Sequence, residues 1–242
     1  MAMWFYRWAS LRNFYRYSGK LLPYLACIAI PLFIYGLVNS LLLAPPDQQQ
    51  GEGYRILYIH VPCAFLSLTV YTTMAIFAFA YLIWRIKIAD ILLKACAPIG
   101  AMFTALALIT GSLWGKPMWG TWWIWDARLT SELILLFIYA GIMGLQAALP
   151  ERENQAALYP AILTLVGVVN IPIIHYSVRW WQTLHQGATL QLFGKSQIAS
   201  SMLSPLLWML SAFCMYTIIA VLQRARCEIL SREQSAYWVK HL

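Results

Sequence analysis

Six long apolar runs constrain this chain more than any other feature of its sequence. They cover residues 21–44, 61–84, 91–113, 129–149, 158–178 and 203–223. A helix needs about 20 residues to cross the roughly 30 Å of hydrocarbon in a bilayer, and each run is long enough. Only 11% of the residues are charged, whereas soluble domains carry about 25%. We therefore predict an all-α, polytopic membrane protein with six transmembrane helices, forming a single domain over residues 1–242.

The distribution of Lys and Arg predicts how the helices are oriented. Five of the 17 basic residues fall in the three loops opposite the amino terminus, and they are Arg55, Lys116, Arg128, Arg179 and Lys195. The other twelve lie on the amino-terminal side. Because loops rich in Lys and Arg stay in the cytoplasm, both termini are expected to be cytoplasmic, and loops 45–60, 114–128 and 179–202 face outward. Membrane lipid is the expected surrounding. The net charge of +8 forms no basic soluble face, so nucleic acid is not an expected partner.

The second outward loop, between the third and fourth predicted helices, is rich in tryptophan. Residues 114–128 hold five of the chain's 12 tryptophans, which are Trp114, Trp119, Trp122, Trp123 and Trp125. An aromatic belt would spread Trp over helix ends on both sides of the membrane. A dense cluster in one loop favours a flat apolar platform for a large planar ligand, with the aromatic belt as the alternative.

Two histidines are expected level with this loop. His60 stands at the outer mouth of the second span, and His185 lies in the third outward loop. Two imidazoles flanking a flat apolar surface are what a six-coordinate heme iron needs. His175, near the outer end of the fifth span, is the alternative to His185; we favour His185 because a loop residue reaches over the platform more easily. His241, at the cytoplasmic end, is expected to be inert.

Arginines on the same face suit the carboxylates of such a ligand. Arg55 and Arg128 are expected to bind the heme propionates, because a guanidinium matches a carboxylate in a two-pronged geometry. The alternative for Arg128 is a local ion network with Asp126 and Glu132. The sequence contains no phosphate-binding Gly-rich loop and no hydrolase signature, so a carrier is favoured over an enzyme.

The motifs resemble those of a known family. The stretch from Trp114 to Thr130 resembles the tryptophan-rich WWD signature of the heme-handling superfamily. The stretches at residues 58–62, which carries His60, and 169–187, which carries His175 and His185, resemble the C protein family of bacterial cytochrome c maturation, the CcmC family, as do the six spans in about 240 residues. The similarity extends from about residue 20 to 223.

This resemblance implies a heme-delivery protein of the bacterial inner membrane. Heme b would be held at the periplasmic face, with His60 and His185 as axial ligands and the tryptophan loop against the macrocycle. The partners it implies are a membrane-anchored periplasmic heme chaperone, subunits of an ABC transporter complex and a small single-span membrane protein.

Three other functions are considered beside heme delivery. A quinol-linked b-type cytochrome needs axial histidines at bilayer depth, and two of the four histidines lie in or beside outer loops instead. A permease subunit of an export transporter would carry no heme. A membrane scaffold would use the tryptophan loop only to dock a partner.

Overall fold

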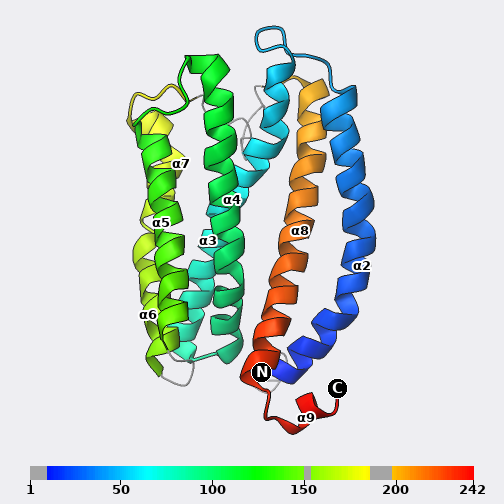
Figure 1. Cartoon of the computed structure of the whole chain (residues 1–242), viewed down its shortest axis with the longest axis vertical. Helices are drawn as coiled ribbons and strands as arrows, with labels where there is room; N and C mark the ends of the chain where they lie inside the picture. Colours follow the sequence, from blue (N-terminus) through cyan, green and yellow to red (C-terminus); the bar gives the residue numbers. More distant parts are fainter. Residues whose placement is uncertain (1–9, 150–153, 186–197) are drawn as a thin grey trace.

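The described chain is built from helices arranged in a bundle (Figure 1). The structure is a computed structural model that describes residues 10–149, 154–185 and 198–242. Its α-helices are α2 (Leu11–Val38), α3 (Leu57–Trp84), α4 (Lys87–Trp119), α5 (Ala127–Ala148), α6 (Asn154–Gly167), α7 (Asn170–Trp180), α8 (Ser200–Arg232) and α9 (Tyr237–Lys240). A π-helical turn, η1 (Asn39–Leu43), continues α2, and a 3₁₀ turn, η2 (Glu52–Ile56), leads into α3.

Six segments are long and apolar enough to cross a membrane, which confirms the predicted architecture. Within the described residues they are Leu11–Leu43, Glu52–Trp84, Lys87–Trp119, Ala127–Ala148, Gln155–Trp180 and Ser200–Arg232. Most extend beyond the predicted spans because hydropathy marks only the part of a helix that lies in hydrocarbon. α4, for example, continues until Gly120 adopts a left-handed conformation (φ 77°) and donates its N–H to the carbonyl of Lys116. Trp114 and Trp119 are therefore helical, not in a loop as predicted.

The helices pack in three groups. α3 and α4 pack closely together at the centre, α2 and α8 pair on one side, and α5, α6 and α7 lie on the other (Figure 1). The start of α2 and the carboxyl terminus lie at the lower end of the bundle, while the turns leading into α3 and α5 lie at the upper end (Figure 1). In the topology expected from the basic residues, this upper end would face outward.

The centre of the bundle depends on one close approach between α4 and α5. Tyr139 on α5 is fully buried, and its hydroxyl donates to the carbonyl of Ser67 on α3 at 2.9 Å. A Cβ at Gly100 of α4 would overlap the hydroxyl end of Tyr139. Because Gly100 has no side chain, Tyr139 of α5 can pass against α4 and donate its hydrogen bond to α3.

Replacing Gly100 with Val should destabilise the protein by about 1–3 kcal/mol, the usual range for overpacking a dense core. The midpoint for heat-induced loss of the monodisperse peak, followed by size-exclusion chromatography in detergent, should fall by about 2–4 °C per kcal/mol. Gly144→Val is the matched control, since a Cβ at Gly144 meets nothing within 4 Å. Equal midpoints for the two variants would contradict this account of the core.

Candidate functional site at the outer end of the bundle

His60 lies in the first turns of α3, slightly inside the helix that it was predicted to precede. Its ring packs against Trp114 of α4, with centroids 5.7 Å and planes 74° apart. Its Nδ1 lies 3.0 Å from the hydroxyl oxygen of Thr110. Because that hydroxyl donates its one proton to the Leu106 carbonyl at 2.6 Å, it accepts from the imidazole. His60 thus carries its proton on Nδ1, which leaves the Nε2 lone pair free for a metal.

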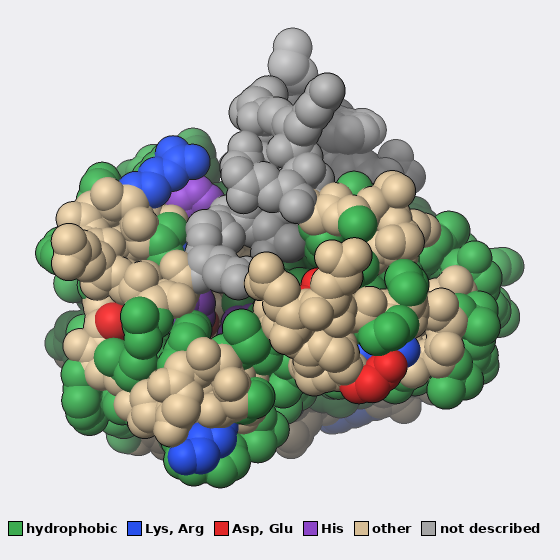
Figure 2. Space-filling view, turned by 90° about the horizontal axis from the view of Figure 1, so that it is seen from above, with side chains coloured by type: hydrophobic (Ala, Val, Ile, Leu, Met, Phe, Trp, Pro, Cys, Tyr) green, Lys and Arg blue, Asp and Glu red, His purple; other side chains and the backbone are tan. Residues whose placement is uncertain are grey.

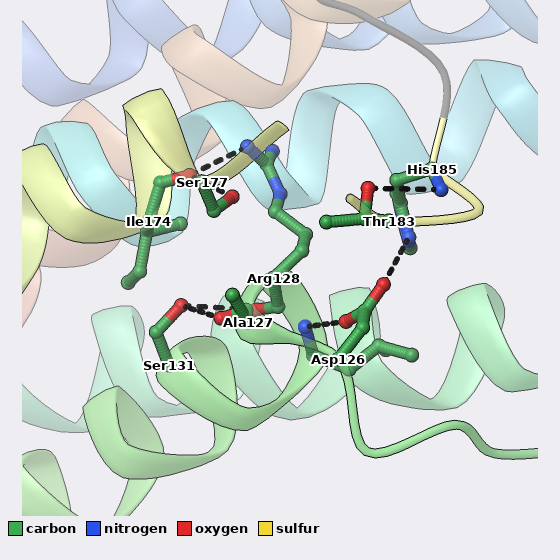
Figure 3. A network of polar contacts seen from close by, with 9 residues as sticks. Asp126, Ala127, Arg128, Ser131, Ile174, Ser177, Thr183 and His185 are labelled. Atoms are coloured by element: carbon green, nitrogen blue, oxygen red, sulfur yellow. Dashed lines mark hydrogen bonds and ion pairs between the residues drawn. The ribbon is translucent and has the colours of Figure 1, made fainter. Parts of the chain in front are cut away.

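His185 follows α7 and meets the same part of α4. Its ring lies 4.9 Å from that of Trp119, at 57°, and its backbone N–H donates to Thr183 Oγ1 at 3.2 Å. Its Nδ1 faces Asp126 Oδ2 at 3.9 Å. The other carboxylate oxygen of Asp126 caps α5 by accepting the N–H of Leu129 at 2.8 Å. One aspartate therefore begins α5 and also faces the imidazole (Figure 3).

The surroundings of His185 keep it neutral. Burial, and then the positive charge of Arg128, lower the pKa of His185 to about 4. The imidazole is therefore uncharged at neutral pH, which is the form that binds metals. Both imidazoles pack against tryptophans of one helix, α4. The fold thus brings together two histidines that are far apart in the sequence.

Helix geometry explains how one motif meets both histidines. Trp114 and Trp119 are five residues apart on α4, which turns them about 140° from each other around the helix axis. Trp114 consequently faces His60, while Trp119 faces His185. Two glycines make room beside them. A Cβ at Gly111 would come within 3.1 Å of His60 Cε1, and one at Gly115 within 2.9 Å of Trp119 Cε3.

The other three tryptophans of the motif lie between α4 and α5. The Trp123 and Trp125 rings meet nearly edge-to-face, with centroids 5.4 Å apart at 75°. Trp122 is 55% exposed beneath the Lys116 ammonium, and Trp125 is 75% exposed. The indoles of Trp123 and Trp125 are therefore not coplanar, and those of Trp122 and Trp125 are largely exposed. Histidine and hydrophobic side chains are visible together on this end of the molecule (Figure 2).

The site suits a ligand that brings most of its own coordination. In the described residues, three buried polar atoms without a hydrogen-bond partner gather here: Trp123 Nε1, Asp126 Oδ2 and His185 Nδ1. Buried polar groups are usually paired, so this cluster marks a place where a further partner fits. The described ranges contain no group of three His, Cys, Asp or Glu that could hold a bare metal ion. A porphyrin supplies four nitrogen ligands itself, so two imidazoles are enough to complete the coordination of heme iron.

The two predicted arginines are placed differently. Arg128 Nη1 donates to the Ile174 carbonyl at 2.9 Å, and within the described ranges it forms no ion pair with Asp126 or Glu132 at 4 Å or less. Arg55 lies in η2, where it pairs with Glu52 and donates to the backbone carbonyls of Ser40 and Ala44. Arg128 thus lies beside the histidines, whereas Arg55 fastens the end of the first helix.

His175, the alternative second ligand, is exposed on α7. Its ring packs against that of Tyr176, with centroids 4.7 Å apart at 88°. It is thus His185 that the structure brings against a tryptophan of the motif. Two further residues of the site were not predicted: Thr110, which orients His60, and Gln50, whose side-chain oxygen accepts from Trp114 Nε1 at 2.8 Å. No pattern in a single sequence marks either residue, because both act through contacts between distant segments.

Known proteins resemble this chain over almost its whole length. The family model described as heme exporter protein C matches residues 4–240. The heme exporter protein C of Escherichia coli (strain K12) is 48% identical over 228 residues, which are 94% of this chain and 91% of the relative. That of Haemophilus influenzae is 48% identical over 242 residues, covering 100% of this chain and 98% of the relative. That of Bradyrhizobium diazoefficiens is 49% identical over 224 residues, or 93% and 84%.

Bacterial relatives and six membrane-crossing helices identify a multi-pass protein of the inner membrane. Together with the tryptophan motif between His60 and His185, the full-length similarity shows that the chain belongs to the heme exporter protein C (CcmC) family.

Proposed function

We propose that this chain binds heme at the outer end of its helix bundle and presents it for cytochrome c maturation, acting as a carrier and not as an enzyme. The observation that carries the proposal is the pair of imidazoles held against Trp114 and Trp119 of one motif. The names of its relatives, which are heme exporters, support the same cargo.

In this proposal His60 and His185 are the axial ligands of the heme iron. Each presents its Nδ1 edge to the protein, His60 to Thr110 and His185 to Asp126. Metal-binding histidines commonly hydrogen-bond through one nitrogen, which orients the ring and leaves the other nitrogen for the metal. Thr110 lies at hydrogen-bond distance from His60, whereas the 3.9 Å between His185 and Asp126 would shorten when the metal binds. Because both imidazoles come from the end expected to face the periplasm, the cargo would be held at that surface and not within the spans.

The remaining residues of the motif supply contact area and charge. Trp122, Trp123 and Trp125, with Trp114 and Trp119, would contact the apolar macrocycle. Arg128 uses one of its five N–H donors on Ile174, so other donors can face a propionate. Arg55 has three of its own donors engaged and is the weaker candidate for a propionate.

The cargo would then pass to other proteins. A membrane-anchored periplasmic heme chaperone is the proposed recipient, with subunits of an ABC transporter complex and a small single-span membrane protein as the other partners. The exposed indoles of Trp122 and Trp125 are suitably placed for a recipient that must approach the macrocycle.

The first test is the visible absorption spectrum of the detergent-purified protein, oxidised and reduced. His60→Ala and His185→Ala should each leave a five-coordinate heme with a shifted spectrum and faster heme loss, and the double variant should retain none. His175→Ala and His241→Ala are matched controls that should behave as the parent.

Three results would point elsewhere. Unchanged spectra and occupancy in both single variants would remove the ligand assignment. A parent that stays colourless when heme synthesis is raised would favour a permease or a scaffold. Rapid reduction by a quinol would favour a b-type cytochrome.

Asp126 allows its two roles to be separated. Asn also caps helices, so Asp126→Asn should keep the stability of α5 while heme affinity falls by about 10–100-fold, the usual loss when a partner of a metal-binding histidine is removed. Asp126→Ala should lose heme similarly and, in addition, about 0.5–2 kcal/mol of stability. Heme titration and thermal size-exclusion assays measure the two effects. If Asp126→Asn binds heme as tightly as the parent, the carboxylate does not support His185.

A further inference from the structure

The fifth membrane-crossing segment is a broken helix. α6 ends at Gly167 and α7 begins at Asn170. In an unbroken helix the carbonyl of Val168 would accept the N–H of residue 172, but Pro172 has none. That carbonyl instead accepts the N–H of Ile171 at 3.0 Å, a tighter bond than those of an α-helix. The chain therefore has a built-in weak point within the membrane-crossing segment that leads to His185.

The two halves of this helix are held in different ways. α6 packs against α3 and α5, and Tyr71 Oη donates to the Thr164 carbonyl at 3.0 Å in a fully buried contact. A Cβ at Gly167 would overlap Tyr71 and come within 2.8 Å of Ile138 Cγ2. The end of α6 is thus closely fitted to two neighbouring helices.

α7 is attached by a narrow stripe. Its buried residues are Asn170, Ile174 and Ser177, and its main packing partner is α5. Two of the attachments are polar. Asn170 Nδ2 donates to the Ser131 carbonyl at 2.9 Å, and Arg128 Nη1 donates to the Ile174 carbonyl at 2.9 Å (Figure 3 shows the second). The third attachment is apolar, because the Ile174 side chain is fully buried in the central core cluster. Each of the two hydrogen bonds contributes only about 0.5–1.5 kcal/mol net.

The contacts between this segment and α5 continue as far as His185. Along α5 the residues that meet this segment are Ser131, then Arg128, then Asp126, and their partners are Asn170, Ile174 and His185. Asn170 and Ile174 of α7 thus dock on α5. The His185 imidazole faces Asp126 at the start of α5 (Figure 3) and also packs against Trp119 of α4. His60, by contrast, is set by α3 and α4.

We propose that α7 and the residues up to His185 form an arm, hinged at Val168–Val169, and that Asn170 and Arg128 are positioning residues that dock this arm on α5. Docking brings His185 to the site, and undocking withdraws it while His60 stays in place. The role of this movement in releasing heme rests on the function proposed above, but the docking is a property of the chain alone. Arg128 holds the arm and also lies beside the site. A heme carboxylate bound by Arg128 would therefore contact the same side chain that docks the arm carrying His185.

Two variants with opposite expected effects test the arm. Asn170→Ala removes one docking bond, so the amides of residues 170–180 should exchange with solvent deuterium about 3–10-fold faster, while those of 155–167 keep the parent rate. Pro172→Ala restores the missing donor at an exposed position and should slow exchange around residues 168–172. Asn39→Ala is the matched control, since it removes a similar 2.8 Å bond to the Tyr35 carbonyl at an exposed site on another helix.

The heme signal supplies the second readout. Asn170→Ala should convert part of the six-coordinate spectrum to five-coordinate, and added imidazole should restore it, which a generally damaged protein would not allow. Pro172→Ala should slow heme transfer to apomyoglobin, used as a neutral acceptor. If the parent protein binds no heme, the proposed function is contradicted but the arm is not, because hydrogen–deuterium exchange tests the arm without heme. The arm is overturned if exchange in 170–180 is unchanged in Asn170→Ala, or if residues 155–167 accelerate equally.

Discussion

The absence of water from the hydrocarbon core decides where chemistry can occur in this protein. Every backbone N–H and carbonyl in that layer needs a partner within its own helix or an adjacent one, so the spans become nearly continuous helices and functional side chains gather where helices end. The outer ends of α3 and α4 and the start of α5 supply His60, Trp114, Trp119 and Asp126. The one span that breaks inside the described bundle does so at Val168–Val169, just before Pro172, and it leads directly to His185.

α4 links the two halves of the site through a simple consequence of helix geometry. Two indoles five residues apart point about 140° apart, so one helix can support an imidazole on each side. Asp126 completes the link, because its two oxygens serve different elements: one begins α5 and the other faces His185. The WWD sequence is thus a structural junction, and its aspartate links the start of α5 to the position of the His185 imidazole.

The sequence predicted the parts of this structure that depend on local pattern. Six apolar runs gave six helices. Two outer histidines were expected beside the tryptophan motif, and His60 lies against Trp114 while His185 lies against Trp119. It did not predict that Trp114 and Trp119 are helical, because hydropathy falls before the helix ends at Gly120. It also did not identify Thr110, Gln50 or the bond from Arg128 to Ile174, since these depend on contacts between helices that no single-sequence pattern encodes. Arg55 looked equivalent to Arg128 by position, yet it folds back onto η1.

A carrier needs a different balance of forces from a protein that keeps its cofactor, and the two histidines differ in a way that suits this need. His60 lies on a continuous helix, with its Nδ1 bonded to the neighbouring α4, whereas His185 follows a short helix attached by a stripe of three buried residues. If both histidines bind heme iron as proposed, two equal ligands on rigid helices would hold heme strongly and release it slowly. One firm and one weakly docked ligand would allow both capture and release, because losing the second imidazole would lower the affinity without dismantling the rest of the site. The break at Val168–Val169 is consistent with that asymmetry.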